Sequence, residues 1–190
     1  MKILVKPLEG IYWEDKSILL WEERKSIEKI FGNISFKDRN LCENGLSFYL
    51  FNTSLRVDFD KNDRVEFIEF LGGFKIDVQA VIYGIEVFKT NADELFELLK
   101  QYNDGEIGDV GNGYCYDFKN ISVGIYREST PESLAEFIKE IRNDDSIDET
   151  IVEEKIKEET LKTNYWETLG IGIKNYYLWN YEYNLTFDKF

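Results

Sequence analysis

Apolar residues recur along the chain in a pattern that occurs twice. In the stretch FKTNADELFELL they stand at Phe88, Leu95, Leu98 and Leu99. In the earlier stretch LWEERKSIEKIF the same spacing places them at Leu20, Ile27, Ile30 and Phe31. Each copy indicates an apolar residue that ends a strand, a polar helix start and a short helix with one apolar stripe. The repeat therefore predicts two similar helices, over 23–31 and 91–101.

The positions after each helix alternate between apolar and polar residues, which predicts strands with one buried face. After the first helix these strands are 46–50, 55–59 and 65–70, and after the second they are 114–118 and 121–126. In this comparison Phe51, which precedes Leu55, corresponds to Phe118, which precedes Ile121. The repeat length of about 67 residues is too long for a solenoid unit and favours a duplicated α+β half-domain.

The predicted architecture is a single α+β domain of two halves, about 3–70 and 76–126. Each half has lead-in strands, a helix and an antiparallel meander, and we expect the two sheets to lie side by side or edge to edge. The rest of the chain, 127–190, departs from the repeat and is expected to form a C-terminal extension with an added helix and aromatic strands. Thr130 and Pro131 predict the start of that helix. Strands are expected over 166–173 and 176–187, the second with Tyr177, Trp179, Tyr181 and Tyr183 on one side.

Acidic residues are concentrated between Asn143 and Thr163, a stretch that predicts either a solvated helix or an acidic loop. Its acidic residues are Asp144, Asp145, Asp148, Glu149, Glu153, Glu154, Glu158 and Glu159. The whole chain has 37 acidic and 23 basic side chains and a formal net charge of −14. This charge argues against binding to nucleic acid or anionic lipid and favours basic protein partners.

The chain contains no histidine, which excludes serine–histidine and cysteine–histidine catalysis and histidine-bound metals. A carboxylate pair remains a possible catalytic arrangement. Asp58, Asp60, Asn62 and Glu69 occupy positions 1, 3, 5 and 12 of an EF-hand loop, but Asp63 stands where that loop needs glycine. A hairpin turning at 61–63, with Arg56, Asp58, Arg64 and Glu66 on its solvent face, explains these residues better. We therefore expect no metal and no cofactor.

The two cysteines, Cys42 and Cys115, are far apart and form no metal-binding or redox motif. The N-terminus has no secretory leader, and no apolar run approaches the ~20 residues of a membrane span. These features predict a cytoplasmic protein with reduced thiols, monomeric or weakly dimeric, that is stable without metal or disulfide.

The helix and meander unit, with E-x-x-I-x-x-I-F-G followed by L-x-V-x-F-D and V-x-F-I-x-F, resembles the β-lactamase-inhibitor-like tandem fold over about residues 10–126. That resemblance implies two helix-plus-sheet halves that form one concave sheet surface. In its acidic, cysteine-poor, single-domain character the chain also resembles bacterial immunity proteins of polymorphic and contact-dependent toxin systems. This second resemblance implies a non-enzymatic antitoxin that occludes a basic toxin domain such as a nuclease.

The functional hypothesis is accordingly a protein–protein interaction in which acidic residues steer a basic partner and aromatic residues hold it. The residues assigned to partner binding are Asp144, Asp145, Asp148, Glu149, Glu153, Glu154, Trp179 and Tyr181. Two alternatives stay open. One is a regulatory or ligand-binding module, and the other is an enzyme that uses carboxylates without histidine.

Overall fold

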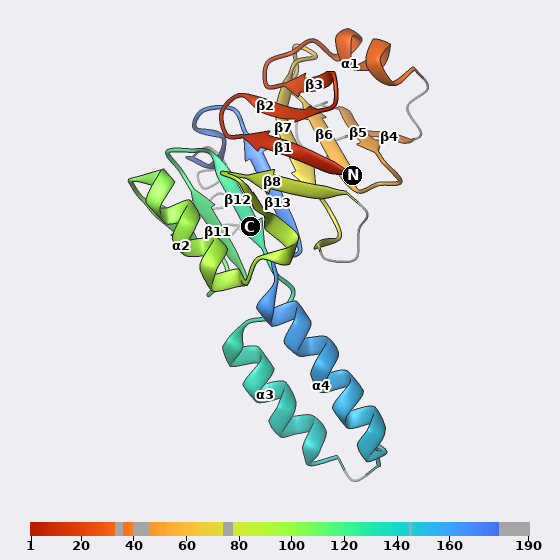
Figure 1. Cartoon of the computed structure of the whole chain (residues 1–190), viewed down its shortest axis with the longest axis vertical. Coiled ribbons are helices and arrows are strands. Elements are labelled where there is room, and N and C mark those ends of the chain that lie inside the picture. The colour runs from red at the N-terminus through yellow and green to blue at the C-terminus, as the bar shows by residue number, and fades with distance from the viewer. Residues whose placement is uncertain (33–35, 40–45, 74–77, 145, 179–190) are drawn as a thin grey trace, which may run out of the picture.

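The computed structural model describes residues 1–32, 36–39, 46–73, 78–144 and 146–178, and it has the predicted α+β class (Figure 1). The strands form two sheets. The first sheet has the order β3-β2-β1-β8-β9 and consists of β1 (Lys2–Lys6), β2 (Gly10–Trp13), β3 (Lys16–Leu19), β8 (Gln79–Ile82) and β9 (Ile85–Glu86). The second has the order β10-β11-β12-β13-β7-β6-β5-β4 and consists of β4 (Phe36–Arg39), β5 (Leu46–Leu50), β6 (Leu55–Phe59), β7 (Val65–Phe70), β10 (Ile107–Asp109), β11 (Cys115–Phe118), β12 (Val123–Tyr126) and β13 (Thr168–Gly172).

The main hydrophobic core lies between the two sheets, which overlap in Figure 1. The strand alternation supplies it, because residues two apart point to the same face. Ile3 and Val5 of β1 face inward from the first sheet, and Val57 and Phe59 of β6 face inward from the second; all four are buried. The first and second parts of the chain also join within the first sheet, where β1 and β8 pair in parallel.

The described residues contain four α-helices, and three of them begin at a side-chain cap. The four are α1 (Arg24–Phe31), α2 (Ala92–Asn103), α3 (Pro131–Arg142) and α4 (Glu149–Asn164). Asn91 caps α2, because its side chain accepts a hydrogen bond from the Asp93 N–H. Thr130 and Ser133 form a capping box on α3, with Pro131 in the first turn. The predicted helices at 23–31, 91–101 and from Pro131 are therefore confirmed.

The strand order of the eight-stranded sheet is symmetric about its central antiparallel pair, β13 and β7. In this pair Leu169 is the register partner of Phe70, and Ile171 is the register partner of Ile68. On each side of this pair a four-strand meander runs to the edge, and the sheets of the two halves thus join edge to edge. Each helix also contacts the turn between the second and third strands of its meander. Phe31 of α1 packs on Phe51, and Asn103 of α2 accepts a hydrogen bond from the Asn120 N–H. Descent from a duplicated half-domain remains a prediction that this arrangement fits.

The second meander differs from the predicted one in the residue at which β12 begins and in the strand that forms its fourth member. Strand β12 begins at Val123, whereas Ile121 lies in the preceding turn, so the residue that corresponds to Leu55 is Val123. The described part of the segment 127–190, which ends at residue 178, is not an appended extension. Helices α3 and α4 are inserted between β12 and β13, and β13 supplies the fourth strand of the second meander. The expected strand over 166–173 is confirmed as β13, and its position at the sheet centre was not predicted.

Two strands and one turn were missed or assigned wrongly. β4 and β10 were not predicted, because Phe36–Arg39 and Ile107–Asp109 are short and lack an apolar alternation. The aromatic strand predicted over 176–187 is wrong at its start, since 176–178 form a helical turn. Residues 179–187 of that prediction, and Cys42, lie outside the described residues.

Candidate functional site

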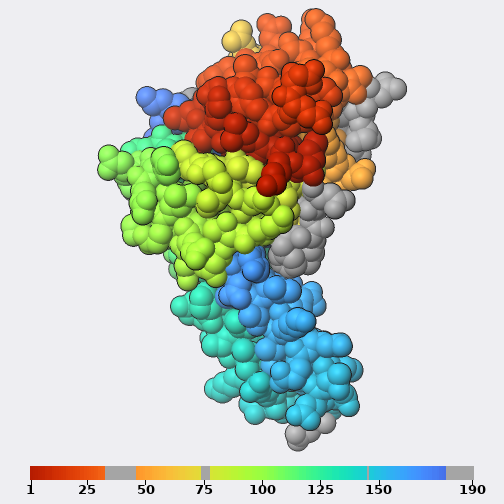
Figure 2. All heavy atoms as spheres, in the orientation of Figure 1, coloured from red at the N-terminus to blue at the C-terminus, as the bar shows by residue number. Residues whose placement is uncertain are grey.

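Helices α3 and α4 form an antiparallel hairpin that projects from the body of the molecule (Figure 1), and Figure 2 shows the same hairpin as a separate lobe. We call residues 131–164 the arm. The residues of the arm contribute nothing to the main hydrophobic core between the sheets. Their own interface is thin, because Ile141 and Val152 are the only buried apolar residues in the described part of the arm, while Ile151 is 46% exposed. The arm is thus an addition to the fold that the packing of the body does not require.

The surface of the arm is strongly acidic, with eleven acidic and five basic side chains between Pro131 and Asn164. Some of these charges are paired. Arg142 contacts Glu153 at 3.2 Å, and Lys162 lies within 4.0 Å of two glutamates of α4 and of Glu128. In the part of the chain that the structure describes, Glu149 and Glu154 have no ion pair. These contacts leave the distal half of the arm with unbalanced negative charge.

The acidic residues predicted to bind a partner gather at the distal turn of the arm and the start of α4. The described ones are all exposed: Asp144, Asp148, Glu149, Glu153 and Glu154. Two of them also have local structural functions. Asp144 accepts hydrogen bonds from the N–H and hydroxyl of Ser146, which lowers the pKa of Asp144, and Asp148 caps α4 by accepting from the Thr150 N–H at 2.9 Å. Asp145, Trp179 and Tyr181 lie outside the described residues, so the proposed aromatic anchors are not placed.

Arg127, directly after β12, connects the arm to the body. Its Nε donates to the carbonyl of Gly113 at 2.9 Å, and its Nη1 donates to the carbonyl of Thr163, in the last turn of α4, at 3.3 Å. The guanidinium also lies 5.0 Å from the ring centre of Trp166. Trp166 in turn donates a hydrogen bond to the Ala92 carbonyl at the start of α2. Arg127 is 6% exposed. It was not singled out from the sequence, because its partners are backbone carbonyls distant along the chain.

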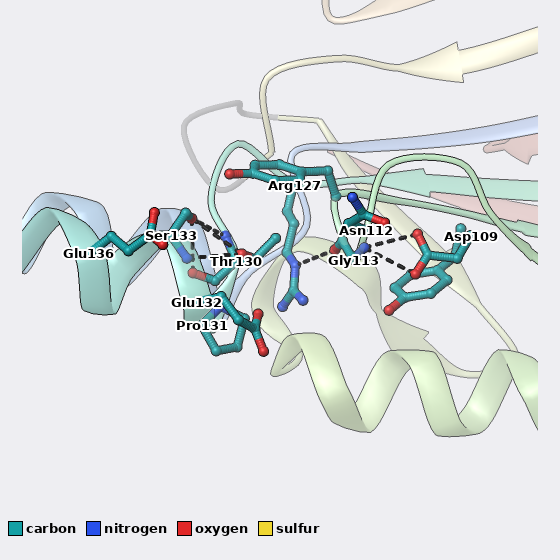
Figure 3. Close-up of a pocket in the computed structure, with 11 residues that line it drawn as sticks. Asp109, Asn112, Gly113, Arg127, Thr130, Pro131, Glu132, Ser133 and Glu136 are labelled. Carbon is teal, nitrogen blue, oxygen red and sulfur yellow. Dashed lines mark hydrogen bonds between the residues drawn. The ribbon is translucent and has the colours of Figure 1, made fainter.

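A pocket of about 510 Å³ opens at the base of the arm (Figure 3). It lies between the loop 109–114, Tyr116, Arg127 and the first turns of α3, from Thr130 to Glu136. The loop is held by Asp109, whose carboxylate accepts hydrogen bonds from the N–H groups of Gly111 and Gly113. No site was predicted in this loop from the sequence. Figure 3 shows the guanidinium of Arg127 directed into the space between Glu132 and Gly113.

The pocket combines one nearly buried cation with carboxylates at its edge. Within the described residues, Arg127 has no carboxylate within the 4.0 Å of an ion pair. Burial raises the pKa of the Tyr116 hydroxyl, and the carboxylate of Asp109 raises it further, against the opposing effect of Arg127. The phenol therefore stays protonated at neutral pH and can donate a hydrogen bond.

A second polar cluster lies on the outer face of the eight-stranded sheet, at the near-EF-hand sequence. The hairpin turns at 60–64 as predicted, with the Asp60 carboxylate accepting from the Asn62 and Arg64 N–H groups. The predicted solvent exposure of Asp58 is wrong: it is 6% exposed and accepts a hydrogen bond from Ser47. Arg56 contacts both Asp58 and Glu69 at 3.2 Å. Burial raises the pKa of Asp58 and of Glu69, while Arg56 opposes the shift.

The turn at 176–178 covers part of the same outer face. Tyr176 stacks on Phe67, with ring centres 4.5 Å apart. The strand residues that pack against Tyr176, Tyr177 and Phe67 are glycines. They are Gly124 on β12, and Gly170 and Gly172 on β13. A Cβ at any of these three positions would lie within 2.8 Å of an atom of Tyr176, Tyr177 or Phe67. The glycines inside strands were the signal in the sequence for this close packing.

The described residues contain neither a metal-binding cluster nor a membrane-spanning helix. Among the residues described, no three histidine, cysteine or carboxylate side chains are grouped so that they could hold a metal ion. No helix in the described ranges combines the length and the apolar character needed to cross a bilayer. Comparison of the chain with protein families, with curated proteins and with solved structures finds no match.

Proposed function

We propose that this protein is a non-enzymatic binding protein that docks a basic protein partner through its acidic arm. An immunity protein that neutralises a basic toxin domain, such as a nuclease, in the cytoplasm is the specific form of this proposal. The observation that carries it is the arm itself. The arm projects from the body, belongs to no sheet and has a large excess of exposed carboxylates.

A projection of this composition has an energetic cost in the free protein. Like charges on one helix hairpin repel each other, and its thin apolar interface offsets this repulsion only partly. A basic partner would relieve the repulsion and bury the exposed apolar residues of α4, Ile151 and Leu161. Long-range attraction between opposite charges raises the rate of association, whereas close packing slows dissociation. The arm presents both carboxylates and apolar side chains on its surface.

The test is a measurement of association and dissociation rates with the protein encoded by the adjacent gene. We expect the association rate to fall about tenfold or more from low salt to physiological salt, where charges are screened beyond about 8 Å. Glu154→Lys should slow association several-fold and leave dissociation nearly unchanged, because Glu154 has no partner in the described structure that the substitution would disturb.

Asp15→Lys provides the matched control. Asp15 is exposed in the turn between β2 and β3, far along the chain from the arm, and the substitution changes the net charge by the same amount. If the two variants slow association equally, then total charge and not the arm is responsible. An association rate that is indifferent to salt and to both variants would refute the proposal.

A further inference from the structure

Arg127 is buried, and no carboxylate among the described residues forms an ion pair with it. A buried cation is usually paired with a carboxylate, because burial removes the water that would otherwise stabilise the charge. Here two backbone carbonyls accept from Nε and Nη1, and among the described residues Nη2 has no hydrogen-bond partner. Because Arg127 lines the pocket and its guanidinium points into it, an unused pair of N–H donors is available to a ligand (Figure 3).

A second donor converges on the same place. Nη2 of Arg127 and the hydroxyl of Tyr116 lie 3.5 Å and 3.6 Å from one point, the position that a Cβ on residue 113 would take. A methyl carbon of Thr130 lies 3.6 Å from the same point, and because residue 113 is glycine, with φ of +90°, no side chain of its own occupies it. A planar carboxylate fits such a pair of donors, since its two oxygens can accept from the guanidinium and the phenol together.

Carboxylates at the edge of the pocket restrict the charge of the rest of the ligand. Glu132 and Glu136, both exposed, line the same pocket from the first turns of α3. A dianion such as phosphate would be repelled by these two carboxylates and by Asp109. A ligand with a cationic group close to its carboxylate would instead be attracted at both ends.

We propose that this pocket binds a carboxylate that carries a nearby cationic group, the chemistry of a basic amino acid or of a peptide chain that ends in lysine or arginine. The carboxylate accepts from Arg127 and Tyr116, and the cation lies toward Glu132 and Glu136. This is a site separate from the distal acidic surface of the arm, and it does not depend on the partner proposed for that surface.

The experiment follows the side-chain N–H signal of Arg127 by ¹H–¹⁵N NMR in the full chain during titration with small probes. L-lysine, L-arginine and the tripeptide Gly-Gly-Lys should each give a saturable shift, with a Kd of about 1 mM or below. The tripeptide amide and cadaverine, which lack the carboxylate, should bind about tenfold more weakly or not at all. Inorganic phosphate should not compete. Tighter binding of the tripeptide than of free lysine identifies a chain end as the source of the carboxylate, and the reverse identifies a free amino acid.

Two variants test the residues. Glu132→Gln should weaken lysine binding about threefold to tenfold but leave binding of hexanoate unchanged, because hexanoate has the carboxylate and no cationic group. Glu140→Gln on α3 is the matched control, since Glu140 is exposed and outside the pocket, and it should change neither. Arg127→Lys, checked for folding by circular dichroism, should lose most of the affinity. The inference is overturned if no probe gives a saturable shift up to about 20 mM, if acid and amide bind equally, or if phosphate binds best.

Discussion

Replacing Gly124 by alanine tests the packing of the 176–178 turn on the sheet. The added Cβ would lie 2.2 Å from the hydroxyl oxygen of Tyr177, whereas ordinary contacts begin at 3.4 Å. Tyr177 must therefore move away from β12, and overpacking of this kind costs about 1–3 kcal/mol. Alanine is also favoured over glycine within a strand by roughly 0.5–1 kcal/mol. The net expectation is a loss of about 0.5–2 kcal/mol in the free energy of unfolding.

The assay is a double-mutant cycle with Tyr177→Ala, measured by urea unfolding. Once the ring is absent, Gly124→Ala should become neutral or stabilising, which gives a coupling of about 1–3 kcal/mol between the two positions. Gly111→Ala is the control, because a Cβ there meets its nearest atom at an ordinary 3.4 Å. If Gly124→Ala costs the same with and without the Tyr177 ring, the proposed contact does not explain the glycine.

Three further predictions concern the body of the protein. Asn91→Ala should lower the free energy of unfolding by about 1 kcal/mol through loss of the α2 cap, whereas Glu23→Ala at the start of α1, where no side chain caps, should have little effect in the same urea assay. Hydrogen bonds from Lys2 and Lys89 lower the pKa of Glu86 from 4.5 to about 2. The stability from Glu86 should therefore be present above pH 4.5 and decline toward about pH 2, a decline that Glu86→Gln should remove from stability curves measured against pH. Finally, the melting temperature should be unchanged by EDTA or by reductant; a large decrease with either would show a structural metal or disulfide.

Some of this structure follows from the sequence because its causes are local. The cap of α2 at Asn91 and the capping box at Thr130 depend on residues two or three positions apart, so the helix starts could be predicted. The alternation in β6 and β7 likewise requires only that one face be buried. The acidic character of the arm is visible in the composition of 143–163, and its solvated helix, α4, is one of the two predicted alternatives.

The tertiary structure decided the features that depend on distant partners. An alternating pattern does not state which strand lies beside which, so nothing in Thr168–Gly172 indicated that β13 would pair with both β7 and β12. The burial of Asp58 arises in the same way, because Ser47 and Arg56 face it from one side of the sheet. The sequence by itself thus determined the elements, their caps and the charge of the arm. Only the folded chain brought Arg127 beside the 109–114 loop and the start of α3, since a pocket forms from the relative position of elements that each fold for separate local reasons.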